Sequence, residues 1–181
     1  AQIRVLDMEE SVKFYTEVMG LVETGRDSSG RVYFKTRQER DHNSVVLRQS
    51  DRAGIDLFAF KVLDKATLDD LEKKLQAHGV KTERIPAGDL LETGERVRFQ
   101  IPTGHTLELY AEKKDVGNGM GYTDPEVNVL DGPGIRPIRM DHCLIYGGNI
   151  DGNLELFEKV LGFTLVERVK LEDGQTDRLP G

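Results

Sequence analysis

Residues 14–21, FYTEVMGL, match residues 156–163, LFEKVLGF, without a gap. At the same shift of 142 residues, from 14 to 156, Asp7 falls on Asn149, and both residue types favour helix N-caps. Each stretch also contains a glycine at the position where a left-handed residue commonly ends a helix. Two unrelated amphipathic helices would not share the caps and the closing glycine at one spacing. We therefore interpret the stretches as copies of one internal repeat, and this repeat decides the fold.

Each copy of the helix belongs to a longer unit of one strand, one helix and three strands. Residues 1–52 open with a short alternating strand, continue with the helix, and end on the strand SVVLRQ, residues 44–49. Residues 53–112 repeat this order around a second helix, residues 67–78, with leucines on one side. The sequence therefore predicts an α+β fold built from tandem βαβββ units.

Residues 113–137 do not continue this order of elements, because they are rich in Gly, Pro and Asp and have no sustained hydrophobic period. We expect an interdomain linker there. A third unit then begins with IRMDHCLIYGG, residues 138–148, and continues to a predicted second strand, 163–171, and a turn, 172–175. Residues 138–181 leave no room for the other strands of a unit, whose sheet edge would stay unpaired. We therefore expect part of a longer chain, with an N-terminal domain at 1–112 and the start of a second domain at 138–181.

The composition is that of an ordinary globular protein, with 38% hydrophobic and 31% charged residues among 181. The sequence has no apolar run of about 18 residues, as a membrane span needs, and its first residues do not resemble a signal peptide. The single cysteine, Cys143, excludes an intrachain disulfide and favours a reducing, cytoplasmic compartment. A net charge of −7 argues against nucleic acid as a partner. A small molecule, a metal ion or further copies of the chain are the expected partners.

His142 is the candidate metal ligand of the third unit. In a strand, His142, Leu144 and Tyr146 share one face, whereas Asp141 and Cys143 point to the other. On the residues alone, such a histidine is either a ligand or an ordinary half-buried side chain. Cys143 is expected in the core. Asp141 is not expected to bind a metal ion, and a role in holding a neighbouring backbone or side chain is not favoured either.

Together these features resemble the vicinal oxygen chelate superfamily, and within it the extradiol ring-cleavage dioxygenases of the catechol 2,3-dioxygenase type. Three stretches carry the likeness, which covers essentially the whole chain: QIRVLDMEESVKFYTEVMGLVETGR (2–26), PTGHTLELYAEK (102–113) and MDHCLIYGGNIDGNLELFEKVLGF (140–163). The resemblance implies the glyoxalase-dioxygenase fold, with mixed curved sheets and flanking helices. It also implies that the N-terminal domain, with its units at 1–52 and 53–112, is not catalytic.

The resemblance further implies a reaction and a metal site. The C-terminal domain would hold Fe(II) between two histidines and one carboxylate, which leaves positions open for substrate and O2. His142 stands at the first histidine, Leu144 would line the substrate pocket, and the other ligands and acid–base residues would follow Gly181. The implied activity is extradiol cleavage of catechol or substituted catechols to 2-hydroxymuconic semialdehyde-type products, in aromatic catabolism. The resemblance also implies a homotetramer.

Two other functions stay open at this point. A metal-free module of the same superfamily would enclose an apolar small molecule. A glyoxalase-like metal isomerase would need ligands in the first two units, where only Glu108 stands at a position that often supplies the metal carboxylate. For Glu108 we favour either a relic of a metal site or a structural hydrogen bond. We interpret the remaining histidines, His42, His78 and His105, as surface residues.

Overall fold

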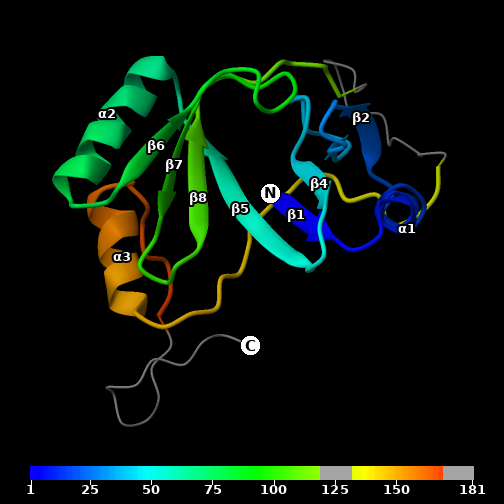
Figure 1. Cartoon of the computed structure of the whole chain (residues 1–181). Helices are drawn as coiled ribbons and strands as arrows, with labels where there is room; N and C mark the ends of the chain where they lie inside the picture. Colours follow the sequence, from blue (N-terminus) through cyan, green and yellow to red (C-terminus); the bar gives the residue numbers. More distant parts are fainter. Residues whose placement is uncertain (119–131, 169–181) are drawn as a thin grey trace, which may run out of the picture.

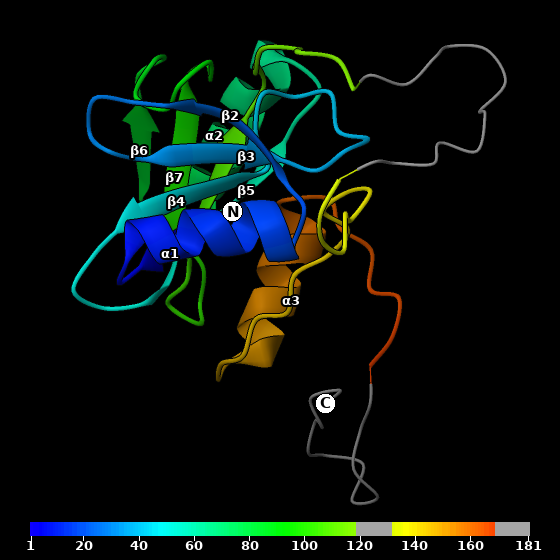
Figure 2. The same cartoon turned by 90° about the vertical axis from the view of Figure 1, so that its right-hand side faces the viewer.

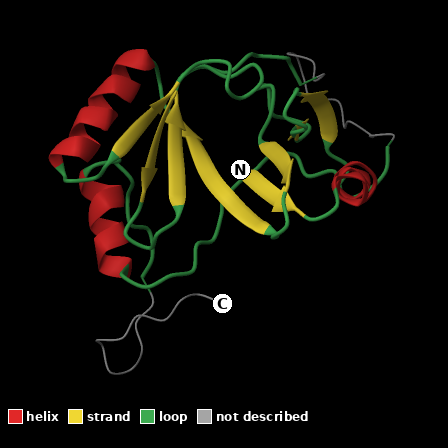
Figure 3. Cartoon of the chain, in the orientation of Figure 1, coloured by secondary structure: helices red, strands yellow, loops and turns green. Residues whose placement is uncertain are grey.

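The computed structural model describes residues 1–118 and 132–168, whose strands form one curved, mixed sheet (Figure 1). The helices lie outside the arch that the strands make (Figure 3). The strand order across the sheet is β2-β3-β4-β1-β5-β8-β7-β6. In chain order the described elements are β1 (Gln2–Val5), α1 (Met8–Lys13), the π-helical turn η1 (Phe14–Val18), β2 (Val22–Arg26), β3 (Val32–Lys35), β4 (Val45–Gln49), β5 (Gly54–Lys61), α2 (Lys65–Ala77), β6 (Thr82–Ile85), β7 (Arg96–Gln100), β8 (Thr106–Tyr110) and α3 (Ile150–Lys159).

The strand pairing confirms the two predicted βαβββ units. In each unit the first strand pairs in parallel with the last, β1 with β4 and β5 with β8. The other neighbours within each unit are antiparallel. An antiparallel contact between β1 and β5 then joins the two units into one sheet. Each unit closes only when its first and last strands meet, so pairing between residues far apart in sequence determines this fold.

The helix boundaries follow from the capping residues that the repeat singled out. The Asp7 carboxylate accepts a hydrogen bond from the Glu10 backbone N–H at 2.9 Å, which satisfies one donor at the start of α1. Asn149 does the same for α3. Gly20 follows η1 with φ +71°, a conformation that L side chains rarely adopt, and a Cβ there would lie 2.6 Å from the Pro133 carbonyl oxygen. The predicted caps and closing glycine are therefore confirmed.

Helix α3 packs on the second unit, beside α2, although it follows the expected linker. Its Leu156 is 1% exposed and Val160 is also buried, in one apolar cluster with Leu68 and Leu75 of α2. Figure 2 shows that α1 covers the other half of the sheet, where β1 and β4 lie. The start of the third unit is thus fixed to the first two by a shared core. Within the described residues, no helix has the length and apolar character of a membrane span.

Asn149→Ala is expected to destabilise the protein by about 1–2 kcal/mol, because it removes the cap of α3 and puts alanine, which tolerates the left-handed region less well than asparagine, at φ +55°. Asn149→Gly is the matched control. Glycine tolerates positive φ and costs only a few tenths of a kcal/mol at an N-cap, so this variant should stay close to the wild type. Urea unfolding followed by circular dichroism measures the difference. Equal stability of the two variants would contradict this account of α3.

The structure corrects the prediction for the start of the third unit. Residues 139–147 form no strand, and neither do residues 163–168, the described part of the predicted second strand. A first strand in this fold pairs with the last strand of its own unit, and residues 132–168 contain no strand to pair with. Cys143, expected in the core, is exposed for the same reason. The predicted turn at 172–175 and part of the expected linker, 119–131, lie outside the described residues.

Candidate functional site

The stretch of residues 138–148, called here the His142 segment, lies along a loop of the first unit. At its start, the Ile138 carbonyl accepts hydrogen bonds from the Gln38 backbone N–H at 2.8 Å and from the Thr36 hydroxyl at 3.0 Å. The Met140 backbone N–H donates to the Glu39 carboxylate at 2.8 Å. These bonds satisfy backbone groups that a strand ladder would otherwise have paired.

His142 presents its imidazole to solvent, with 87% of the side chain exposed. Its Nδ1 lies 3.2 Å from the Asp141 carboxylate, so Asp141 contacts a neighbouring side chain, a role that the sequence did not favour. This hydrogen bond, together with the Arg139 guanidinium, holds the pKa of Asp141 below its ordinary value. A carboxylate on one ring nitrogen is the usual arrangement of a metal-binding histidine, whose other nitrogen then faces the ion.

His142 is the only part of a metal site that the described residues supply. Its imidazole has the right chemistry and is accessible, which fits one ligand of a metal ion. Across 1–118 and 132–168, however, no group of three or more His, Cys, Asp or Glu side chains could hold one. Leu144, the predicted pocket-wall residue, is 51% exposed, and Tyr146 is exposed as well. Ile145 between them packs against the core cluster of α3, so His142, Leu144 and Tyr146 lie on the open side of the segment.

Glu108 has a structural role, one of the two alternatives favoured for it. Its side chain is completely buried, and its two carboxylate oxygens accept hydrogen bonds from Arg96 Nε at 2.7 Å and Arg98 Nε at 2.8 Å. Arg96 also contacts Asp89 at 2.6 Å, so the buried charge of the guanidinium is balanced on two sides. Both oxygens of Glu108 are thus already engaged, which leaves the glyoxalase-like alternative without its one candidate ligand in the first two units.

The predictions for the other three histidines are mixed. His78 is exposed at the end of α2, as expected. His105 is half-buried, and its Nδ1 lies 2.9 Å from the Thr103 hydroxyl. His42 is buried against the Tyr33 ring, so its placement on the surface was wrong. Its charged loop suggested solvent, but the His42 backbone N–H bonds to the Lys114 carbonyl and the chain folds over it.

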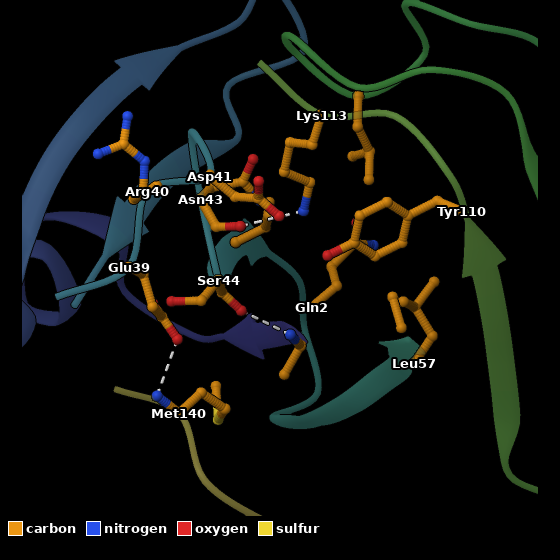
Figure 4. Close-up of a pocket in the computed structure, with 14 residues that line it drawn as sticks. Gln2, Glu39, Arg40, Asp41, Asn43, Ser44, Leu57, Tyr110, Lys113 and Met140 are labelled. Carbon is orange, nitrogen blue, oxygen red and sulfur yellow. Dashed lines mark hydrogen bonds between the residues drawn. The ribbon is translucent and has the colours of Figure 1, made fainter. Parts of the chain in front are cut away.

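A pocket of about 280 Å³ lies on the inner side of the sheet, between the two units (Figure 4). Its walls are mostly apolar, with polar groups from the first unit and from the chain that leaves β8. The lining residues that Figure 4 labels are Gln2, Glu39, Arg40, Asp41, Asn43, Ser44, Leu57, Tyr110, Lys113 and Met140. The His142 segment therefore borders this pocket through Met140.

Lys113 is a partly buried cation of this pocket. Its ammonium donates to the Asn43 carbonyl at 3.0 Å and lies 4.3 Å from the centre of the Tyr110 ring. Burial lowers the pKa of Lys113 from 10.5 to about 8. No pattern in the sequence predicts this role, because Lys113 lies at the border between the second unit and the expected linker.

Raising the pH from 8 to 9.5 is expected to increase the free energy of unfolding, and the titration of Lys113 is the cause. The folded pKa, about 8, lies below the unfolded value, 10.5, so the unfolded chain binds more protons in this window and stability rises with pH. Urea unfolding at pH 7, 8 and 9.5 should show a steeper rise for the wild type than for Lys113→Met. Lys114→Met, at an exposed neighbour, should keep the wild-type slope. The raised pKa values of Cys143 and of Tyr33 act in the opposite direction as the pH passes their ordinary values, 9.0 and 10.0, but they do so in the wild type and in both variants, so the comparison of slopes isolates Lys113. Equal slopes for the wild type and Lys113→Met would refute this assignment.

Comparisons with known proteins agree on one group of enzymes. A family model described as the catechol 2,3-dioxygenase-like N-terminal domain matches residues 55–114. A metapyrocatechase of Pseudomonas sp. (strain CF600) is 45% identical over 174 residues, which are 96% of this chain and 57% of that protein. A manganese-dependent 2,3-dihydroxybiphenyl 1,2-dioxygenase of Geobacillus genomosp. 3 is 24% identical over 93% of this chain and 54% of its own.

A solved structure shows the same fold. The 2,3-dioxygenase LapB from Pseudomonas sp. KL28 superposes with a TM-score of 0.92 and 58% sequence identity, over 98% of this chain and 62% of that one. The chain therefore spans between about half and two thirds of the length of the relatives that it matches. The match with LapB extends over nearly the whole chain, so it takes in the segment that carries His142 and helix α3.

Proposed function

Because this chain is a homologue of the extradiol dioxygenases of the catechol 2,3-dioxygenase type over nearly its whole length, we propose that the whole protein cleaves catechols with O2. The ring of catechol or a substituted catechol opens beside its two hydroxyl groups to a 2-hydroxymuconic semialdehyde-type product, as a step of aromatic catabolism. The observation that carries this proposal is the 45% identity to a metapyrocatechase along 96% of the chain.

The proposal includes a metal ion, which we take to be Fe(II). Enzymes of this group depend on a metal, and one relative is named for manganese, so the identity of the ion is a separate question from the reaction. When bound, the ion supplies an electrophilic centre with open positions for small oxygen ligands. His142 would hold it through Nε2, with the Asp141 carboxylate on Nδ1 fixing the orientation of the ring.

In this proposal the other residues of this chain bind the substrate and exclude water, and they do not react. Leu144, on the open side of the His142 segment, would form part of an apolar wall for the aromatic ring. Residues 1–112 form a domain that does not react with the substrate, 113–137 link it to the next, and 138–181 begin the reactive domain. The remaining metal ligands lie outside the described residues in this proposal. We also propose a cytoplasmic homotetramer.

The experiment uses the whole protein, loaded anaerobically with Fe(II) and then given catechol and O2. We expect the yellow ring-opened semialdehyde to accumulate, and the protein without metal to give none. A parallel preparation loaded with Mn(II) decides between the two ions. Colourless mixtures with every catechol tried, from protein that retains its metal, would rule out the proposed reaction.

A further inference from the structure

The first unit contacts the His142 segment through one short loop, residues 36–39. The loop bonds to Ile138, and it also contacts the segment through the Glu39 carboxylate. One oxygen of this carboxylate accepts a hydrogen bond from the segment (Figure 4), and the other accepts one from its own loop. Its Oε1 accepts from the Met140 N–H at 2.8 Å, and its Oε2 accepts from the Thr36 N–H at 3.1 Å. Glu39 thus links its own loop to Met140, which lies 101 residues further along the sequence.

The loop that presents Glu39 is itself held rigidly. The buried Lys35 donates from its ammonium to the Glu39 carbonyl at 2.9 Å and also to the Gly117 carbonyl. Thr36 is buried, and its hydroxyl is used on Ile138. A carboxylate in such surroundings has little freedom to turn away from Met140. Hydrogen bonds to an ionised acceptor are also stronger than those between neutral groups.

The far end of the His142 segment has a second attachment, on the second unit. Gly147 passes so close to Thr103 that a Cβ at Gly147 would lie 2.7 Å from the Thr103 methyl group. Thr103 and Asn153 of α3 exchange two hydrogen bonds, both of 3.3 Å. Ile145 packs into the core cluster of α3. The chain is therefore fixed at Met140 and again from Ile145 to Gly147, and His142 lies between these points.

We infer that Glu39 is a positioning residue for the metal site: it holds the backbone two residues before His142, so the first unit helps to fix the imidazole. The inference rests on the proposed function, in which His142 binds the metal. The bonds to Glu39, Thr36 and Gln38 tie the start of the segment, Ile138 to Met140, to the first unit. The domain that does not react would then contribute to metal affinity without touching the metal.

Glu39→Ala in the whole protein is the test. We expect the dissociation constants of Fe(II) and Mn(II), measured by anaerobic chelator competition, to rise about 10-fold, as for lost outer-shell contacts. Hydrogen exchange of the amides of 138–148 should become faster in the same variant. Glu39→Gln keeps an oxygen for the Met140 N–H, so its metal affinity should stay within about 3-fold of the wild type. Thr36→Val, which removes the hydroxyl that bonds to Ile138 and also contacts the Glu39 carboxylate, should shift both readouts in the same direction by less.

Glu23→Ala is the matched control, since Glu23 lies in the same unit, pairs with Arg26 and is not in contact with the His142 segment in the described structure. It should leave metal affinity and the exchange of 138–148 unchanged. Wild-type metal affinity in Glu39→Ala, or an equal loss in Glu39→Ala and Glu23→Ala, would overturn the inference. Loss of affinity in Glu39→Gln as large as in Glu39→Ala would also overturn it. A wild-type protein that binds no metal would instead defeat the proposed function, so the two failures are distinguishable.

Discussion

His142→Ala in the whole protein is expected to weaken metal binding by at least about 100-fold and to abolish formation of the yellow product. Loss of a direct ligand should exceed the 10–100-fold cost of losing an outer-shell contact. The fold itself should be little affected. The His142 side chain is 87% exposed, and its one described hydrogen bond is to the neighbouring Asp141, so stability should change by no more than about 0.5 kcal/mol. Metal titration and thermal unfolding of the same preparation separate the two effects.

The control for this variant is His78→Ala. His78 is likewise exposed, but it lies at the end of α2, away from the His142 segment. Its replacement should leave metal affinity and product formation at the wild-type level. Retention of wild-type metal affinity by His142→Ala would show that the ion is bound elsewhere.

Glu108→Ala is expected to cost about 3–5 kcal/mol of folding stability, because it leaves the buried Arg96 guanidinium without its main counter-charge. Arg98 loses the same partner, although it is only partly buried. In a protein of this size 1 kcal/mol shifts the melting temperature by roughly 2–4 °C, so the change should be large in thermal unfolding. The metal affinity of the folded variant should not change, since Glu108 belongs to the ion cluster and not to the metal site.

Glu83→Ala supplies the comparison. Glu83 also faces Arg98, but at 3.8 Å and with 66% of its side chain exposed, so its removal should cost less than about 0.5 kcal/mol. If Glu108→Ala lost the metal and kept its stability, Glu108 would be a metal ligand, as the glyoxalase-like alternative requires. Equal melting temperatures for the two variants would contradict the structural role of Glu108.

The repeat made much of the fold predictable. Helix caps act over a few residues, so Asp7 and Asn149 and the glycines after their helices could be recognised from spacing alone. Alternation of apolar residues placed the strands of the first two units, because one face of the sheet packs against the helices. The role of Glu108 was foreseen only as a preference between two possibilities. The structure explains this role, because Arg96 and Arg98 on the adjacent strand bond to both carboxylate oxygens.

The wrong predictions, and the contacts that were not predicted, involve parts of the chain that are distant in sequence. Residues 139–147 have the pattern of a strand, but a strand also needs a neighbour, and pattern does not report one. No pattern in the sequence predicts that Glu39 contacts Met140, or that Lys113 lines the pocket beside the Tyr110 ring. His42 was misplaced because charged neighbours suggested solvent, whereas the loop is covered by the chain after β8. Such contacts depend on how elements assemble, which local propensity does not encode.

Locating the metal ion is the most direct test of the central claim, that His142 is a ligand. Crystals of the whole protein, grown anaerobically with Fe(II), would show the ion by anomalous scattering at the iron edge. We predict one site per chain, with Nε2 of His142 bound to the ion and the Asp141 carboxylate on Nδ1. An ion bound at other residues, with the His142 imidazole turned to solvent, would contradict the account.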